Sequence, residues 1–391
     1  MRRLSPGRVS VVCAEVPPEV VGGLGRYAER MMPALRAPVT VYGTTAGRTR
    51  TERIGGVTLH RLRTPGGTTR LGRVTGMLAF NVRAAWHILR TSRSGSVVAV
   101  HDWMGCLAGI LCAAVGRRPV VFHVHTQEGG ALSLVGAGIA ALERAQARLA
   151  RLVVVPSAGM RDDLTARGWP AARLRVIPHG FEDPELVRLA EAPAEERERL
   201  RDEVRARYLP GGAGRLIVFA GRLSSHKGVR ELIRAVPILL GKHDHVRVVL
   251  VGAQAPRTDD NAAIARLIDE LGVGAHVVAD YRFLPPADVF AHFLAADVCA
   301  FPSTYEPFGL VAVEAMALGR PVVVGPGYSA EVVGDGALRC ADDLSAALLQ
   351  ILDDPVAAGR LGRSGAAHVR DRYSWARTAE LTLAAYAEAA R

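Results

Sequence analysis

The chain of 391 residues contains very little lysine, few aromatic residues and no paired cysteines. Of its 49 basic residues only two are lysines, Lys227 and Lys242. Aromatic residues make up 5% of the chain, so valine, alanine and leucine must fill its cores. The five cysteines form no CxxC pair and no zinc-ligand spacing, which excludes a disulfide framework and favours a reducing cytoplasm.

Long hydrophobic runs are missing as well. The uncharged apolar stretch at 103–115 is about half of the roughly 20 residues that cross a membrane. The N-terminal segment is basic but has no apolar core before the first expected strand, so no signal peptide is predicted. Hydrophobic residues make up 49% of the chain and charged residues 22%, which excludes a disordered protein. A cytoplasmic globular protein of two or three domains is expected.

Positive charge is concentrated in the first half of the chain. Residues 1–205 contain 30 arginines and 18 acidic residues, a net charge of +12, whereas residues 206–391 have 19 basic and 20 acidic residues. Such an excess favours an anionic partner, which would be a phosphorylated substrate, an anionic lipid surface or nucleic acid. A solvated basic surface explains it equally well. No nucleic-acid-binding motif is present, so no nucleic-acid partner is expected.

Short β-branched runs alternate with longer amphipathic segments, which is typical of doubly wound α/β domains with buried parallel strands. Strands are expected at 8–14, 39–43, 57–62, 97–101, 119–124, 152–156 and 174–177, then at 216–220, 246–251, 277–279, 297–301 and 321–324. Helices are expected at 23–35, 74–89, 104–115, 131–150 and 158–166, then at 229–240, 261–271, 286–295 and 310–318.

The charged segment 183–212, punctuated by proline and glycine, separates the two series and predicts a helix followed by a linker. The sequence therefore predicts two Rossmann-like domains at 1–205 and 206–372. A C-terminal helix at 373–391 is expected to pack back on the first domain. Ligands of such folds bind at the carboxyl ends of the strands, so a cleft between the two domains is the expected site.

The segment 301–324 is the most informative motif. Gly309 is expected at the mouth of a helix, where the backbone N–H groups of residues 308–311 would form an anion site. Glu306 in the preceding loop and Glu314 inside the helix suit hydroxyl groups, which donate hydrogen bonds to carboxylates. The segment therefore predicts a ligand with both phosphate and polyol parts. An ordinary strand–turn–helix with solvated acids is the alternative.

A second motif, at 219–228, opens the second series. Arg222 offers a planar fork for phosphate oxygens and Lys227 offers a point charge. Both follow an expected strand directly, where the ligand site should lie. Because the chain uses arginine almost everywhere else, a lysine here indicates a specific role. Two surface cations at a turn are the alternative.

In the first half, polar clusters follow three expected strands. The glycine-rich loop 21–25 would let a ligand or the opposite domain approach the backbone. His101 and Asp102 follow one strand, and the segment 123–128 follows the next. His123 and His125 are two residues apart, which is a spacing that places two metal ligands on the same face of a strand. The sequence offers no third ligand cluster and no Asp-x-Asp motif, so no metal site is expected.

These motifs together resemble family 4 retaining glycosyltransferases of the GT-B fold. Glu306 and Glu314, separated by seven residues with Pro-Phe-Gly after the first, resemble the family's E-x7-E signature. The segment 221–228, GRLSSHKG, resembles its phosphate motif, and 153–160 and 176–181 match its usual strand endings. The resemblance covers nearly the whole chain, and the motifs at 22–25 and 101–103 are also similar to glycogen and starch synthases.

The resemblance implies a role for each matching residue. Arg222 and Lys227 would hold the diphosphate of a nucleotide-sugar, Glu306 the sugar hydroxyls and Glu314 the ribose. The implied catalytic residues are His125, Arg222, Lys227 and Glu306. The implied donor-binding residues are Gly22, Gly23, Arg222, Lys227, Arg282, Phe308, Gly309, Leu310 and Glu314. The implied acceptor-binding residues are His101, Asp102, Gln127 and Glu128.

One departure bears on the substrate. Val20 and Val21 stand where a starch synthase would carry a lysine before the glycines, and Arg26 stands where that group has an acid. These differences argue against synthesis of a polymer from ADP-glucose.

The sequence and the resemblance together predict a metal-independent retaining glycosyltransferase that needs no cofactor. It would move a sugar from a UDP- or GDP-sugar to a small-molecule acceptor, for example in aminocyclitol-type specialised metabolism. The developing charge on the leaving diphosphate would be stabilised by cations and the helix mouth. The alternatives are a cell-envelope enzyme with a lipid-linked acceptor whose basic N-terminal domain contacts the membrane, a nucleotide-sugar epimerase, a phosphorylase and a non-catalytic binding protein.

Overall fold

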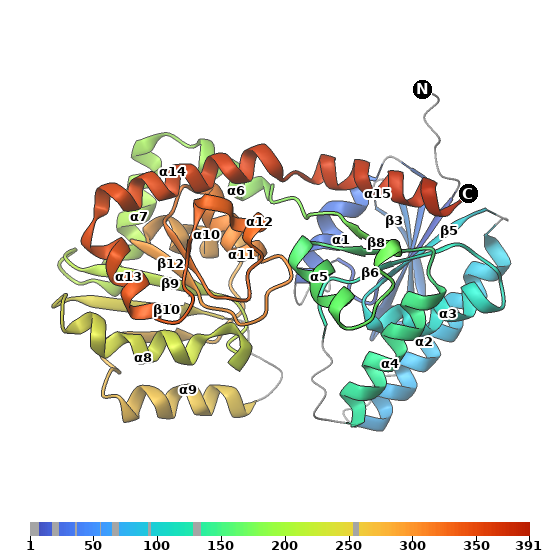
Figure 1. The fold of residues 1–391 in the computed structure, drawn as a ribbon, viewed down its shortest axis with the longest axis horizontal. Helices are drawn as coiled ribbons and strands as arrows, with labels where there is room; N and C mark the ends of the chain where they lie inside the picture. The colour runs from blue at the N-terminus through green and yellow to red at the C-terminus, as the bar shows by residue number, and fades with distance from the viewer. Residues whose placement is uncertain are drawn as a thin grey trace. The chain divides into compact units, whose positions relative to one another are not determined.

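The computed structural model describes residues 8–17, 23–35, 37–54, 56–64, 70–92, 95–127, 134–252 and 258–391. The chain forms two compact units (Figure 1). The first comprises Met1–Gly180 with Trp375–Arg391, and the second comprises Phe181–Ser374. Among the helices described, none is both long enough and apolar enough to cross a membrane.

The first unit is built on an eight-stranded sheet of order β3-β4-β2-β1-β5-β6-β7-β8. All neighbouring strands are parallel except β3, which pairs antiparallel with β4 at the sheet edge. β3 was not predicted because its residues, RTERI, are mostly exposed and lack an apolar run. The strands are β1 (Val9–Val12), β2 (Val39–Thr45), β3 (Arg50–Ile54), β4 (Val57–Arg63), β5 (Val97–His101), β6 (Val120–His123), β7 (Leu152–Val155) and β8 (Leu174–Val176).

Helices cover both faces of this sheet, because its strands carry apolar residues on both sides. One core packs α1 and α15 against Val9 and Val11, and the other packs α2 and α3 against Val12. α3 packs against both α2 and α4. The helices of this unit are α1 (Gly23–Ala34), α2 (Arg70–Thr91), η1 (Trp103–Gly105), α3 (Cys106–Ala114), α4 (Leu134–Leu149), α5 (Ala158–Ala166), η2 (Ala171–Arg173) and α15 (Trp375–Ala389).

The last helix, α15, returns to the first unit although 194 residues of the second unit precede it in the chain. The hydroxyl of Tyr386 lies 3.0 Å from Nε2 of His123, and both side chains are buried. The hydroxyl of Thr378 donates to the carbonyl oxygen of Pro178 at 2.7 Å. The first unit is therefore completed only when the end of the chain is in place.

The second unit contains a six-stranded parallel sheet of order β11-β10-β9-β12-β13-β14 around one continuous core. Its strands are β9 (Arg215–Ala220), β10 (Val246–Val251), β11 (Val277–Asp280), β12 (Val298–Phe301), β13 (Val322–Val324) and the unpredicted two-residue β14 (Leu338–Arg339). Its helices are α6 (Pro184–Glu191), α7 (Ala194–Tyr208), η3 (Ser225–Lys227), α8 (Val229–Leu240), α9 (Thr258–Glu270), α10 (Pro286–Ala295), α11 (Leu310–Ala317), α12 (Ala330–Val333), η4 (Gly334–Gly336), α13 (Leu344–Asp353) and α14 (Pro355–Arg372).

Residues 181–205 belong to this second unit, so the predicted boundary between residues 205 and 206 differs from the structure. Leu186 and Val204 are buried in its core, and Arg205 forms an ion pair of 2.9 Å with Asp297. The many charged residues of α7 hid this narrow apolar face in the sequence. The chain passes from one unit to the other between Gly180 and Phe181.

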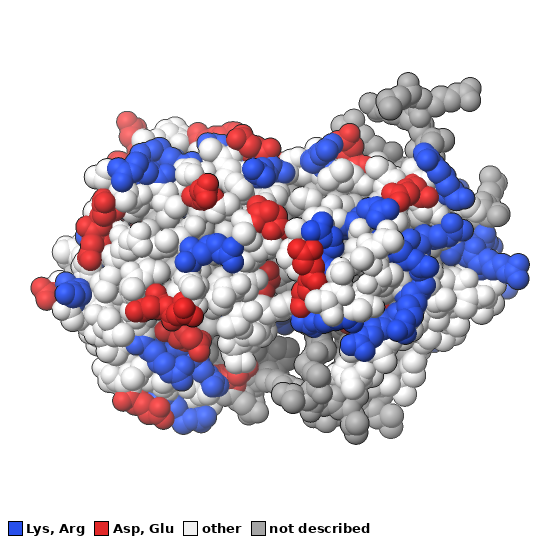
Figure 2. Space-filling view, in the orientation of Figure 1, with Lys and Arg blue, Asp and Glu red and all other residues white. Residues whose placement is uncertain are grey.

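The charge difference between the units is larger than the two halves of the sequence suggested. The first unit has 27 arginines and 11 acidic residues, a net charge of +16. The second has 22 basic and 27 acidic residues, a net charge of −5. In Figure 2 basic side chains accordingly outnumber acidic ones over the first unit.

Candidate active site

The turn after β9 carries Lys227 and packs directly on the loop after β12. Gly228 has a φ of +72° and ends the short helix η3. A side chain at this position would collide with the carbonyl oxygen of Pro302, so only glycine allows the two loops to touch. The backbone N–H of Thr304 donates to the carbonyl oxygen of His226 at 2.9 Å. The two sequence motifs are thus joined through their backbones.

Their side chains meet as well. Nζ of Lys227 lies 2.6 Å from Oε2 of Glu306, and only 18% and 11% of the two side-chain surfaces are exposed. The hydroxyl of Ser303 donates to the same carboxylate oxygen at 3.4 Å. A partly buried ion pair is screened less by water and salt than a surface pair. The lysine is therefore held in one place, at the carboxyl end of the sheet.

The helix α11 begins four residues beyond Glu306. Gly309, at its N-terminus, has a φ of +88°, and a side chain there would collide with the ring of Tyr328. The first N–H groups of a helix have no acceptor within it and carry partial positive charge, which here falls on Leu310 and Val311. Glu314 lies inside α11 and is 5% exposed. The structure thus places the Lys227–Glu306 pair just before the N-terminus of α11, with the buried Glu314 about one turn inside that helix.

Two further residues predicted for the donor site lie on exposed loops of the same unit. Arg222 is exposed, and its guanidinium forms no ion pair with any residue that the structure describes. Arg282 follows β11 and forms a bidentate pair with Asp280, at 2.9 and 2.7 Å. That pair lowers the pKa of Asp280. Only Nε and Nη2 of Arg282 are engaged in this pair, so Nη1 remains available to a ligand.

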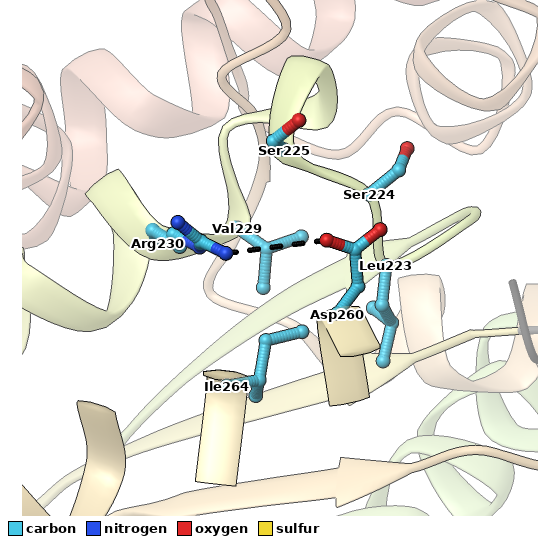
Figure 3. A pocket seen from close by; sticks show the side chains of 7 residues that line it. All are labelled: Leu223, Ser224, Ser225, Val229, Arg230, Asp260 and Ile264. Carbon is cyan, nitrogen blue, oxygen red and sulfur yellow. Dashed lines mark ion pairs between the residues drawn. The ribbon is translucent and has the colours of Figure 1, made fainter. Parts of the chain in front are cut away.

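A shallow hollow lies between the turn after β9 and the helices α8 and α9 (Figure 3). Arg230 and Asp260 approach to 4.0 Å across it and connect α8 to α9. None of the predicted donor-binding residues lines it. Its lining residues are Leu223, Ser224, Ser225, Val229, Arg230, Asp260 and Ile264. Neither Lys227 nor Glu306 is among the residues that line it.

In the first unit, three histidines form a hydrogen-bonded row at the carboxyl ends of the strands. Nδ1 of His101 lies 2.9 Å from Nε2 of His125, and Nδ1 of His125 lies 3.4 Å from Nε2 of His179. The ring of Tyr27 packs against this row, 4.4 Å from His125 between ring centroids. His123 stacks on His101 at 4.4 Å. The sequence predicted roles for His101 and His125 but not for His179 or Tyr27.

Burial keeps these imidazoles neutral. It lowers the pKa values of His101, His123 and His125 well below the ordinary value, and that of His179 to about 3. A neutral imidazole has one donor and one acceptor nitrogen, so neighbouring rings in the row must point their protons the same way. Both ring nitrogens of His125 are engaged by this row. The arrangement fixes the orientation of the His125 ring.

The structure adds a third histidine to the pair considered as metal ligands. Nitrogen atoms of His101, His123 and His125 lie within 4.8 Å of one another. The three rings are nearly parallel, with interplanar angles of 11–15°. A metal binds in the plane of each imidazole ligand, so these rings would have to rotate to converge on one ion. Their present geometry is that of a hydrogen-bonded and stacked cluster.

Asp102 positions the segment that carries His125. Its carboxylate accepts the backbone N–H of His125 at 2.7 Å, and it is 3% exposed. Its φ of +54° is unusual for a residue other than glycine and costs conformational energy. Gln127 accepts a hydrogen bond from Arg167 at 2.8 Å. Gly23 begins α1, whereas Gly22 and Glu128 lie outside the described residues.

Comparison with known proteins identifies the family. The family model described as Glycosyltransferase Family 4 matches residues 21–183, and that described as Glycosyl transferases group 1 matches residues 201–368. The chain is 31% identical to the D-inositol 3-phosphate glycosyltransferase of Kineococcus radiotolerans, over 80% of this chain and 75% of that protein. The chain belongs to the family 4 glycosyltransferases. This glycosyltransferase is also 28% identical to the glycogen synthase of Mycobacterium tuberculosis, over 98% and 95% of the two chains.

Solved structures confirm the fold of the glycosyltransferase. Sucrose-phosphate synthase from Thermosynechococcus elongatus matches with a TM-score of 0.78 and 22% identity, over 96% of this chain and 97% of that one. The catalytic domain of starch synthase IV from Arabidopsis thaliana matches with a TM-score of 0.74 and 16% identity, over 99% of each chain. These matches confirm the predicted GT-B fold, and membership of the family confirms the predicted enzyme class. The use of a nucleotide-sugar donor is supported.

Proposed function

We propose that this glycosyltransferase moves a sugar from a nucleotide-diphosphate sugar to a phosphorylated small-molecule acceptor, with retention of anomeric configuration. The observation that carries the donor part is the Lys227–Glu306 pair beside the N-terminus of α11. Solved structures of similar fold are described as complexes with UDP and glucose or with UDP-2-fluoro glucose, which supports the same donor class.

The donor would be held through its diphosphate. Lys227, Arg222 and the first N–H groups of α11 would stabilise the negative charge that grows on the leaving group. When phosphate oxygens take over Lys227, the carboxylate of Glu306 becomes free to accept hydrogen bonds from the sugar hydroxyls. Glu314, about one turn inside α11, would accept hydrogen bonds from the ribose hydroxyls. The ion pair between Lys227 and Glu306 thus keeps these two side chains in position before the donor binds.

His125 would bind the sugar as a neutral imidazole. Because burial lowers its pKa, it cannot supply a positive charge near neutral pH. Its ring is oriented by His101 and His179, which engage both of its nitrogens. A hydrogen bond from Nδ1 to the sugar would therefore require the longer contact of 3.4 Å with His179 to open. The acceptor hydroxyl would attack from the face that the diphosphate leaves, and a leaving phosphate oxygen would take its proton.

The acceptor is proposed to carry a phosphate because the first unit has a net charge of +16. Arg26 lies on α1 next to Tyr27, whose ring contacts His125, and it is our candidate for the acceptor phosphate. The names of two relatives contain a phosphorylated small molecule. They are the D-inositol 3-phosphate glycosyltransferase and the alpha-maltose-1-phosphate synthase of Mycolicibacterium smegmatis.

The test is a matched screen of donors and acceptors. Glucose and mannose esters of UDP, GDP and ADP are each combined with glucose 1-phosphate, inositol 3-phosphate, and the same compounds without phosphate. We expect one nucleotide-sugar to be consumed, with transfer only to a phosphorylated acceptor. Transfer to glucose or inositol at least as fast as to their phosphates would contradict the proposed acceptor. Conversion of the donor without any acceptor would contradict glycosyl transfer itself.

A further inference from the structure

The outer side of α2 presents a row of exposed apolar residues. Val74, Leu78, Val82 and Trp86 follow one another at intervals of four, so they lie along one side of the helix. Their exposed fractions are 55%, 49%, 52% and 53%. The row, which we call the α2 stripe, extends over roughly 18 Å.

The stripe is not needed for the core of the first unit. The opposite side of α2 supplies Phe80, Ala84 and Ile88, each completely buried, and it packs on α3 (Figure 1). α2 therefore has two apolar sides, of which one is buried in the core and the other is exposed to solvent. Large apolar side chains that gather on a protein surface mark an interaction site more often than isolated ones do.

Basic residues flank the stripe and acidic residues are missing from it. α2 contains four arginines and no Asp or Glu. The guanidinium of Arg90 lies 4.8 Å from the ring centroid of Trp86, and Arg83 is exposed. The end of α3 lies beside the end of α2, because Arg118 donates to the carbonyl oxygen of Ser92 at 2.8 Å. There Val115, which is 72% exposed, and the exposed Arg117 extend the surface.

We propose that the α2 stripe and its arginines bind the enzyme to the surface of an anionic lipid bilayer. A helix with an apolar side and arginines beside it lies in the membrane interface, with the apolar side chains among the acyl chains and the guanidinium groups at the phosphates. Tryptophan prefers this interface because one end of its ring is polar. A second copy of the chain fits poorly, because two units of +16 with arginine-flanked stripes would repel each other.

This inference does not depend on the identity of the acceptor. Membrane binding would hold the enzyme at the bilayer whether its acceptor is soluble or is part of a lipid. Its test can therefore fail while glycosyl transfer stands, and the reverse is also true.

The test is co-sedimentation of the full chain with vesicles. One set consists of phosphatidylcholine alone, and the other contains about one third phosphatidylglycerol, so that only surface charge differs. We expect the anionic vesicles to bind the enzyme more tightly than the phosphatidylcholine vesicles, by about ten-fold or more. This binding should weaken in about 0.5 M salt. The Leu78→Ser/Trp86→Ala variant and the Arg83→Gln/Arg90→Gln variant should each lose about ten-fold or more, since each arginine near such a surface contributes about five-fold.

Matched variants in the second unit serve as controls. Ile238→Ser removes an apolar side chain that is 56% exposed, and Arg363→Gln/Arg370→Gln removes two exposed arginines of α14. Both should bind vesicles as the wild type does. All variants should keep the wild-type melting temperature within a few degrees, which shows that they fold. Equal binding to both kinds of vesicle, or unchanged binding by both α2 variants, would overturn the proposal. So would a dimer or a complex with another protein that depends on the stripe and replaces vesicle binding.

Discussion

Lys227 and Glu306 lie 79 residues apart in the chain, and their side chains meet at 2.6 Å. The contact depends on Gly228, which lets the turn with Lys227 rest on the loop that leads to Glu306. The two residues therefore belong to one site although they come from different βα units. Lys227 is one of only two lysines in a chain that otherwise uses arginine.

Glu306→Gln should lower the rate of sugar transfer strongly while leaving the enzyme folded. Glutamine keeps the size of the side chain but removes the charge that pairs with Lys227 and would accept the sugar hydroxyls. We expect kcat to fall by about 100-fold or more, in line with the loss of one charge-stabilising group. Initial rates with saturating donor measure this. If the variant kept the wild-type kcat, Glu306 would not take part in the transfer.

Gly228→Ala should destabilise the second unit and abolish donor binding. Alanine is strained at a φ of +72°, and its side chain would collide with the carbonyl oxygen of Pro302. The matched control is Gly211→Ala, which has a φ of +90° but open space around it. The control should lose about 1 kcal/mol of unfolding free energy, and Gly228→Ala clearly more. Equal losses in urea denaturation would show that the contact with Pro302 is unimportant.

The buried histidines should make the enzyme sensitive to acid. The pKa of His179 is lowered to about 3, so the unfolded chain binds a proton there that the folded chain does not. Its contribution to stability is complete above the unfolded pKa of about 6.5 and declines as the pH falls toward the folded value. From about pH 7.5 to pH 5.5, protonation at this one residue should lower the free energy of unfolding by about 1.4 kcal/mol.

The measurement is urea denaturation at both pH values for the wild type and for His179→Gln. Glutamine does not titrate, so the variant should lose less stability on acidification than the wild type by about that amount. If the two proteins lost the same free energy, the neutral state of His179 would not be a source of the pH dependence.

Tyr386→Phe should loosen the C-terminal helix. The variant removes the hydroxyl that lies 3.0 Å from Nε2 of His123 and leaves that nitrogen buried without its partner. We expect a loss of about 1–3 kcal/mol in unfolding free energy. Tyr281→Phe, at a half-buried tyrosine of the second unit, is the control and should lose little. Protease digestion should then release α15 faster from the Tyr386 variant, and equal digestion rates would contradict this role.

Much of the fold could be predicted because buried parallel strands leave continuous apolar runs. Val97–His101 and Val246–Val251 are examples in which the expected and observed strands coincide. β3 escaped prediction because an exposed edge strand has no such run. The change of unit at Gly180 was missed because α7 is dominated by charged residues and buries only Val204, which leaves no apolar period to detect.

The site was predictable to the extent that it depends on local motifs. Lys227 and Glu306 each lie in a short segment whose glycines and charges indicate a ligand. Tyr27 and His179 could not be found in this way, because only tertiary packing brings α1 and the end of β8 beside His125. The buried Asp102 carries a backbone strain that no sequence pattern reveals.

The most direct test of the account is calorimetric titration of the enzyme with UDP, GDP and ADP, the diphosphates that sugar transfer would leave behind. We expect one of them to bind the wild type, and to bind Lys227→Ala more weakly by about 100-fold or more. Lys242→Ala, which removes the other lysine of the chain, should bind it as the wild type does. Equal affinity of all three proteins for every diphosphate would contradict the account.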